Sequence, residues 1–583
     1  MLYTETPLPT LAEIEDRLSA PEIGDLPRMR LAVLRNVTME SIQGYLQYMA
    51  HELGFRADVA FGGFDNIVQE ALGGAPELLH RELDAALVFA PLPALSTLLD
   101  IGFSALSPAQ VEEEVTRLVA LFGTVVRGIR NQSNAMILWH GLEPPLYPAM
   151  GIQDAQLPNG QLAMVARLNE GLRQALSSVD NAYLVSMEVC LARLGARQFY
   201  DLRYWQLARS PYSRQALAEI AREDFKYLRA VKGRARKCFV LDCDNTLWGG
   251  IVGEDGLEGI KLGSSYPGSA FVEFQREILS LHRRGVILAI CSKNNEADVM
   301  EVFDRHPDMV LKPEHIAAWR INWRDKASNL REIAAELNIG IDSLVFADDS
   351  PFEADLARSM VPEVQVLQLP HARPSEYRWI LAACGAFDLP RITDEDRKRG
   401  ALYQAESGRQ RERAKCSNLE SYCRSLEMKL HIGRADVMSI PRIAQQTQKT
   451  NQFNLTSRRY SDADIRSFAE SPDHEVLWLR VADKFGDMGI VGTCVLRYQG
   501  DEAAIDILLL SCRALGRGIE GRFLAEAMHL ARRRGVRRIL GQYIASAKNS
   551  QVEGFYAGQG FVPAPRKGRG GDWFVLDLEQ LPA

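Results

Sequence analysis

The sequence lacks several features that mark special classes of protein. No apolar run approaches the roughly 18 residues that cross a bilayer, so we expect no membrane-spanning segment and no membrane partner. The nine cysteines include no C-x-x-C pair, so the sequence lacks the common pattern of a zinc site. The N-terminal stretch MLYTETPLPTLAEIEDRLSA is polar and acidic, unlike a signal peptide. Scattered thiols without a disulfide framework fit a reducing compartment, so we expect a cytoplasmic protein.

An excess of positive charge is also absent. The 583 residues carry 68 Lys and Arg against 75 Asp and Glu, a formal net charge of -7. Nucleic-acid binding needs a basic surface, so this balance argues against a general nucleic-acid partner. Hydrophobic residues make up 46% of the chain and charged residues 25%, as in folded globular proteins. The length predicts about three or four domains of roughly 100–200 residues each.

Residues 238–246, CFVLDCDNT, hold the strongest chemical pattern. Cys238–Leu241 are largely apolar and predict a buried parallel strand, and Asp242 and Asp244 follow it one residue apart. Residues i and i+2 of an extended backbone face the same side, so both carboxylates can meet one phosphate and one Mg²⁺. One carboxylate would attack phosphorus, and the other would handle the proton. By itself, this pattern is equally compatible with an acidic turn after a core strand.

Two further positions supply polar groups that could act on a phosphate. Ser292 follows the apolar strand-like run 286–290 and can hydrogen-bond the transferring phosphoryl oxygen. Lys326 precedes an amphipathic helical pattern and can neutralise charge on the nucleophile and the phosphate. Taken singly, Ser292 could be a helix cap and Lys326 a surface lysine.

A second pair of carboxylates, Asp348 and Asp349, follows the apolar run SLVFA, with Glu353 next in reach. Hard oxygen ligands suit Mg²⁺. Each of the four motifs falls where a parallel strand would end, at the edge where open α/β sheets bind ligands. We therefore expect a magnesium site with four carboxylate ligands: Asp242, Asp244, Asp348 and Asp349.

Residues 1–232 predict a separate domain ahead of this site. Strand-like runs such as RLAVLRNVT, ADVAFGGF, ALVFAPL, NAMILWH and AYLVSMEV alternate with helical patterns such as VEEEVTRLVALFGTVVRGIR. This alternation favours a parallel α/β sheet. The loop after the first run, Leu34–Thr38, contains no serine, and no D-x-x-H is evident downstream.

Residues 391–427 are rich in Arg, Glu and Gln and predict a helical linker to a third domain, residues 428–583. There, the strand-like run AIDILLLSC leads directly to Arg513, Gly516 and Gly518, which open a long helical pattern. Glycines let backbone N–H groups approach a phosphate, and a helix N-terminus favours an anion. This loop is therefore a candidate pyrophosphate site.

These motifs resemble three known superfamilies. The four motifs of residues 233–390 resemble the haloacid dehalogenase (HAD) superfamily, and residues 1–232 resemble the SGNH-hydrolase-like domain of some long HAD proteins. Without the serine, we expect a non-hydrolytic scaffold or docking domain. The R-x-x-G-x-G loop, together with the F-Y-x-x-x-G-F run, resembles the GNAT superfamily, in many of whose members the tyrosine, here Tyr556, protonates a leaving thiolate. The resemblance implies a multidomain α/β protein: an SGNH-like α/β domain, a HAD Rossmann-like parallel-sheet domain and a GNAT-like α+β domain.

Several longer runs are similar to FkbH-type proteins of polyketide biosynthesis. These runs are DCDNTLWGG, ICSKNN, FADDSPFE, TNQFN and residues 483–489. The resemblance implies that the protein takes a glyceryl unit from 1,3-bisphosphoglycerate, holds it as an enzyme thioester, removes the phosphate and passes the unit to an acyl carrier protein. The GNAT-like domain would then receive the phosphopantetheine of that carrier protein, or CoA.

Such a reaction needs a thiol that carries the acyl group, because an acyl phosphate is a good acyl donor to a thiolate. Cys243, between the two motif-one aspartates, is the first candidate, and Cys291, beside Ser292, is the second. Either could instead be a small buried apolar residue. Two other functions stay open: a HAD phosphatase fused to a CoA-dependent N-acetyltransferase of a sugar or amino compound, and a carrier-docking scaffold.

Overall fold

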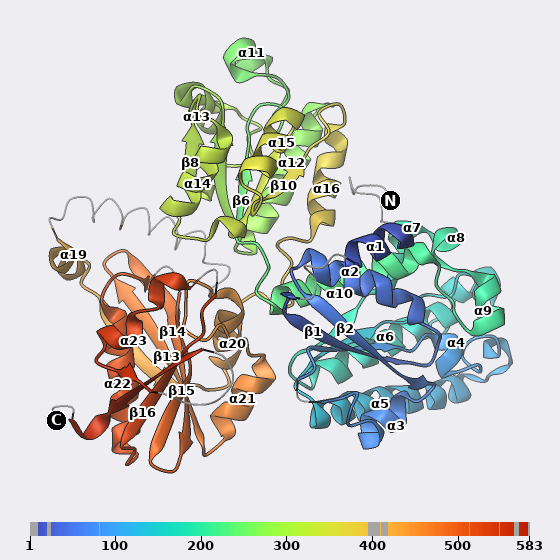
Figure 1. Cartoon of the computed structure of the whole chain (residues 1–583). Helices are drawn as coiled ribbons and strands as arrows, with labels where there is room; N and C mark the ends of the chain where they lie inside the picture. Colours follow the sequence, from blue (N-terminus) through green and yellow to red (C-terminus); the bar gives the residue numbers. More distant parts are fainter. Residues whose placement is uncertain are drawn as a thin grey trace. The chain divides into compact units, whose positions relative to one another are not determined.

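The computed structural model describes residues 10–19, 25–80, 82–393, 409, 418–511, 514–546, 549–564 and 571–580. The chain divides into two compact units, Met1–Arg229 and Ala230–Ala583. Within the described residues, one β-sheet lies in the first unit and two lie in the second (Figure 1). The predicted multidomain α/β fold is confirmed, and the domain boundaries at residues 232, 390 and 427 remain predictions. In the part of the chain that is described, no helix combines the length and apolar character needed to cross a membrane.

The first unit is built on a five-stranded sheet in the order β2-β1-β3-β4-β5, in which all neighbouring strands are parallel. Its strands are β1 (Arg28–Arg35), β2 (Arg56–Phe64), β3 (Ala85–Phe89), β4 (Met136–His140) and β5 (Ala182–Val185). Every residue of β3 and β4 is buried. Parallel strands buried on both faces read as continuous apolar runs, which explains why these segments were visible in the sequence.

Helices cover this sheet (Figure 1). Two long helices, α5 (Pro108–Gln132) and α6 (Gln161–Ser177), share a hydrophobic core with sheet residues such as Val88 and Trp139. The α5 helix begins with a capping box, in which Ser107 accepts from the Gln110 amide. The remaining helices are α1 (Leu11–Leu18), α2 (Gln43–Glu52), α3 (Ile67–Gln69), α4 (Leu92–Leu95), α7 (Met187–Leu194), α8 (Ala196–Phe199), α9 (Leu202–Ala208) and α10 (Arg214–Val231).

The first sheet of the second unit is also fully parallel, in the order β10-β9-β6-β7-β8. Its strands are β6 (Cys238–Leu241), β7 (Ile287–Ser292), β8 (Ile316–Ile321), β9 (Leu344–Asp348) and β10 (Gln365–Gln368). The surrounding helices are α11 (Val252–Gly259), α12 (Gly268–Arg283), α13 (Glu296–Arg305), α14 (Lys326–Glu336), α15 (Pro351–Met360) and α16 (Tyr377–Cys384). Because β6 lies between β9 and β7, the carboxyl ends of these three strands meet at one edge.

The second sheet of this unit follows the order β11-β13-β14-β15-β16-β18-β17. Its strands are β11 (Lys429–Arg434), β13 (His474–Asp483), β14 (Gly486–Gln499), β15 (Glu502–Leu510), β16 (Arg538–Tyr543), β17 (Val562–Pro563) and β18 (Asp572–Asp577), and β12 (Phe453–Asn454) pairs with β15. Among the described strands of this sheet, only β15 and β16 are parallel neighbours, because the helix α22 (Ile519–Arg533) connects them as a crossover.

Four shorter helices accompany this sheet: α19 (Leu419–Ser425), α20 (Ile440–Lys449), α21 (Asp462–Glu470) and α23 (Phe555–Gly558). Most of the linker predicted at 391–427 lies outside the described residues, so its helical state remains a prediction.

Candidate active site

The predicted phosphoryl-transfer residues lie at the carboxyl ends of the parallel strands of the second unit. Asp242 directly follows β6, Ser292 ends β7 and Asp348 ends β9. Lys326 opens α14, the helix that follows β8. The Asp242 amide donates to the Ala347 carbonyl oxygen at 3.0 Å, which ties the end of β6 to that of β9. Parallel pairing therefore brings together residues that are far apart in the sequence.

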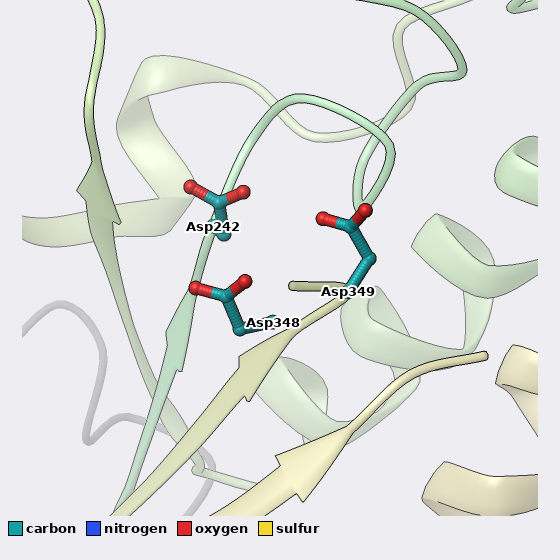
Figure 2. A group of neighbouring side chains, drawn as sticks. All are labelled: Asp242, Asp348 and Asp349. Atoms are coloured by element: carbon teal, nitrogen blue, oxygen red, sulfur yellow. The ribbon is translucent and has the colours of Figure 1, made fainter. Parts of the chain in front are cut away.

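Three carboxylates form a compact group at this edge. Asp242, Asp348 and Asp349 each offer an oxygen, and these oxygens lie within 4.8 Å of one another. Figure 2 shows the three side chains gathered where two neighbouring strands end. Asp242 and Asp348 are buried, and Asp349 is partly exposed. Clustered hard oxygen donors with one side open to solvent are the donor set that Mg²⁺ prefers, so these residues fit a magnesium ion.

Lys326 supplies a positive charge inside the group. Its Nζ lies 2.8 Å from Asp242 Oδ1 and 2.6 Å from Asp348 Oδ2, and its side chain is only 5% exposed. An ammonium between two buried carboxylates balances part of the charge that would otherwise be buried unpaired. The sequence interpretation of Lys326 as a charge-neutralising residue is therefore geometrically reasonable.

The carboxylates still repel one another. Burial, together with the charge of Asp242, raises the pKa of Asp348, and the same causes raise the pKa of Asp349 to about 6. Raised pKa values mean that the ionised cluster is costly without a further cation. A divalent ion held by these oxygens would remove that cost, which is a second reason why the residues fit Mg²⁺.

Asp244 lies apart from this group of three. Its Oδ1 accepts from the Trp248 indole at 2.9 Å and from the Val252 amide at 3.1 Å, and its Oδ2 accepts from Asn294 Nδ2 at 3.0 Å. Burial raises the pKa of the Asp244 carboxyl. A carboxyl held by neutral donors with a raised pKa suits proton transfer, and its role as a metal ligand remains a prediction.

Sequence reasoning missed several partners of these residues. Asn294 also donates to Ser292 Oγ at 3.2 Å, and it stands in the S-K-N-N run directly after β7, where its position could have drawn attention. His371 Nδ1 lies 3.1 Å from Asp349 Oδ2, and Lys293 Nζ lies 2.6 Å from Glu353 Oε1. His371 has no local motif around it, so only the fold could have placed it beside Asp349.

The two candidate thiols are both fully buried. Burial raises the pKa of the Cys243 thiol well above its usual value, with Asp242 as the next cause. Burial also raises the pKa of the Cys291 thiol. The nucleophile in thioester formation is the thiolate, which a raised pKa disfavours. Either cysteine as the acyl carrier remains a prediction, and these environments suit small buried apolar side chains.

The described part of the candidate pyrophosphate loop contains two glycines in the left-handed region. Gly516 and Gly518 take φ values of 70° and 71°, which glycine adopts without strain, and Gly518 caps the N-terminus of α22. The Gly516 amide donates to Glu520 Oε1 at 2.6 Å, so an internal carboxylate already takes one of the amides that a phosphate would use. Arg513 lies outside the described residues.

Tyr556 lies inside the core of the same sheet. Its residue exposure is 0%, its hydroxyl has no hydrogen-bond partner among the described residues, and burial raises its pKa well above the usual value. Its ring fills the space that a Cβ on Gly541 would occupy, since that atom would come within 2.4 Å of the ring. The described surroundings of Tyr556 are therefore those of a packed core residue.

In the first unit, the loop after β1 contains Asn36 and no serine, as the sequence has it. The fold also brings together a buried histidine and a buried carboxylate that are far apart in the sequence: His140 Nε2 lies 2.9 Å from Asp224 Oδ1. The other ring nitrogen, Nδ1, lies 3.0 Å from the Val88 carbonyl oxygen. Both nitrogens of His140 are therefore engaged, which leaves neither for activating a nucleophile.

The fold and the carboxylate site thus define a multidomain α/β protein with a phosphatase-type arrangement at the end of a parallel sheet. The chain is similar to the N-terminal part of the protein BF1531 from Bacteroides fragilis, which contains a phosphatase domain and was solved in complex with Mg. The sequences are 26% identical, the match covers 66% of this chain and 98% of the other, and the TM-score is 0.58.

Shorter matches cover about a quarter of the chain. One is the ribosomal-protein-S18-alanine N-acetyltransferase from Escherichia coli, with 14% identity over 25% of this chain and 91% of the other, at a TM-score of 0.20. Another is the PaiA N-acetyltransferase from Thermoplasma acidophilum in complex with coenzyme A, with 17% identity over 26% of this chain and 99% of the other, at a TM-score of 0.19. No protein-family model matches the chain, and no curated protein does either.

Proposed function

We propose that the second unit is a Mg²⁺-dependent phosphoryl-transfer enzyme that forms a phosphoaspartate on Asp242. The observation that carries this proposal is the group of Asp242, Asp348 and Asp349 with the Lys326 ammonium between two of its members. The magnesium ion and the phosphatase domain named for the similar Bacteroides fragilis protein support it. Asp242, Asp348 and Asp349 would hold the ion, which would neutralise phosphoryl charge when bound.

The residues of the chain divide the reaction between them. An Asp242 carboxylate oxygen forms a bond to phosphorus while the bond from phosphorus to the leaving oxygen breaks, and Asp244 gives its proton to that oxygen. Water then attacks the phosphoaspartate, Asp244 takes a proton from it, and the bond from phosphorus to Asp242 breaks. Lys326 and Ser292 would bind the phosphoryl oxygens during both steps.

The finer proposal is that the substrate is 1,3-bisphosphoglycerate and that the glyceryl unit passes through an enzyme thioester to an acyl carrier protein. The FkbH-like runs around Asp242, Ser292 and Asp348 support this choice. The product would feed polyketide starter or extender units. Cys243 and Cys291 remain the two candidate acyl carriers, and the phosphopantetheine of the carrier protein would dock at the C-terminal domain.

The alternative of a CoA-dependent N-acetyltransferase receives less support. The catalytic role that this alternative gives to Tyr556 needs a hydroxyl in reach of substrate, whereas its side chain is 0% exposed. The hydrogen bond from the Gly516 amide to the Glu520 carboxylate would also have to break before that amide could donate to a pyrophosphate.

The test is phosphate release and intact mass in one incubation of the full chain with 1,3-bisphosphoglycerate, Mg²⁺ and a candidate carrier protein. Thiol attack on the acyl phosphate frees the first phosphate, and Asp242 removes the second, the 3-phosphate. Asp242→Asn should therefore abolish release of the 3-phosphate only, because an amide is a poor nucleophile. Undiminished release of the 3-phosphate from this variant would refute the phosphoaspartate. An increase in the intact mass of the carrier protein by one glyceryl group would support the finer proposal. Phosphate release without an acyl group on either protein would support phosphatase activity alone.

A further inference from the structure

The Asp244 carboxylate is held from two directions by neutral donors. Trp248 comes from the segment between β6 and α11, and its indole N–H donates to Oδ1 at 2.9 Å. Asn294 comes from the loop after β7, and its amide donates to Oδ2 at 3.0 Å. Both residues are buried, Trp248 at 0% and Asn294 at 5% exposure. Each oxygen of Asp244 therefore has a fixed donor.

Asp242 is held differently. Its carboxylate pairs with the Lys326 ammonium at 2.8 Å, so a cation faces the proposed nucleophile. The Asp244 oxygens instead face the neutral indole of Trp248 and the neutral amide of Asn294. The two aspartates of the D-x-D pair are thus separated in role by their partners as well as by their positions.

We infer that Trp248 and Asn294 are positioning residues that aim the Asp244 carboxyl at the leaving-group oxygen. This inference rests on the proposed phosphoryl transfer to Asp242. The Trp248 ring packs edge-on against Phe303 at 6.4 Å between centroids, so the indole is itself fixed. Asn294 is fixed through its second bond, to Ser292 Oγ at 3.2 Å. Two anchored donors hold the acid in a single orientation, which proton transfer requires.

The segment around Trp248 strengthens this arrangement. The Val252 amide, at the start of α11, also donates to Asp244 Oδ1, at 3.1 Å. Gly250 N donates to Asn245 Oδ1 at 2.8 Å, and the Tyr377 hydroxyl donates to the Asn245 carbonyl oxygen at 2.9 Å. The turn that carries Trp248 is therefore tied down at several points.

The test uses the dependence of the rate on the leaving group. An alkyl phosphate releases a poor leaving group that needs the proton of Asp244, whereas p-nitrophenyl phosphate releases a phenolate that needs little help. The quantity to measure is kcat/KM, because it reports the steps up to transfer onto Asp242 and omits later hydrolysis of the phosphoaspartate. Glycerol phosphate serves as the alkyl substrate.

Trp248→Phe keeps the ring and removes only the donor. We expect kcat/KM for glycerol phosphate to fall by about tenfold or more, and that for p-nitrophenyl phosphate by less than about threefold. Asn294→Ala should give the same substrate-dependent pattern and serves as the second variant should Trp248→Phe fold poorly. The matched control is Trp319→Phe, which removes an indole donor to Glu296 in the same part of the chain and should alter neither value.

Equal losses on the two substrates in both variants would overturn the inference, because a general structural defect does not depend on the leaving group. Unchanged kinetics on both substrates would overturn it as well. Wild-type protein that releases phosphate neither from these two substrates nor from 1,3-bisphosphoglycerate would refute the proposed function and the inference together. Normal wild-type turnover that Asp242→Asn abolishes, with no leaving-group effect in the variants, would refute the inference alone.

Discussion

Replacing Lys326 by methionine tests the electrostatic design of the site. The Lys326 ammonium lies between Asp242 Oδ1 and Asp348 Oδ2, at 2.8 and 2.6 Å, with its side chain 5% exposed. Methionine has a similar length and no charge, so it leaves a group of carboxylates without its cation. Removing one partner of a buried ion pair costs about 3–5 kcal/mol. At about 2–4 °C per kcal/mol for domains of 150–250 residues, the melting temperature should fall by roughly 6–20 °C.

The loss should depend on pH and on Mg²⁺ in a defined direction. Burial already raises the pKa values of Asp348 and Asp349, and loss of the ammonium should raise them further, so the folded variant should bind extra protons as the pH falls. The difference in melting temperature from wild type should therefore be larger at pH 8 than at pH 5.5 in EDTA. Excess Mg²⁺ should reduce it, because the ion replaces part of the missing positive charge.

Differential scanning fluorimetry measures the melting temperatures, and phosphate release measures the reaction. Phosphate release should fall by about 10²–10³-fold, the usual effect of removing one charge-stabilising group. Lys261→Met is the matched control, since Lys261 is an exposed lysine in the same part of the chain and should change neither property. A Lys326→Met variant that matches this control in stability and in phosphate release would refute the reasoning.

Two further predictions follow from the same site. Because the pKa of Asp349 is raised to about 6 and Mg²⁺ binds the ionised form, the gain in melting temperature from Mg²⁺ should be larger at pH 7.5 than at pH 5.5. At 100 times its dissociation constant the ion should add about 2.7 kcal/mol, and a gain that grows toward acid pH would contradict this. Cys243→Ala should retain phosphate release and lose about 1 kcal/mol of stability, because the buried thiol lies outside the carboxylate group. Intact-mass measurement of the same variant shows whether the acyl group still loads, and loss of the thioester there would identify Cys243 as its carrier.

Much of the fold and of the site could be predicted because the relevant signals are local. Buried parallel strands appear as short apolar runs, so β3, β4, β6 and β9 were visible without any knowledge of their neighbours. Where such an apolar run stops at a polar residue, the same local pattern marks that residue as the end of the strand. Asp242, Ser292 and Asp348 could therefore be assigned to strand ends, and parallel pairing then implied a common edge.

Other features depended on contacts between distant segments. The Asp244 carboxylate accepts from Asn294, which stands 50 positions further along the chain, and the local spacing does not predict that pairing. The His140–Asp224 pair joins residues 84 positions apart. Burial was equally hidden: the F-Y-x-x-x-G-F run predicted Tyr556 as a cofactor-binding residue, and the run does not show that packing against Gly541 encloses its hydroxyl. The cofactor-binding role of Tyr556 remains a prediction.

The sequence by itself determined where the strands run, which polar residues end them and that phosphate chemistry was to be expected there. Those properties follow from the order of apolar and polar residues along a few consecutive positions. Only the tertiary structure decided which carboxylates share a cation, which one is held by neutral donors and which thiols and hydroxyls are closed to solvent. The physical reason is that charge, pKa and accessibility depend on neighbours in space, and the folded sheets choose those neighbours.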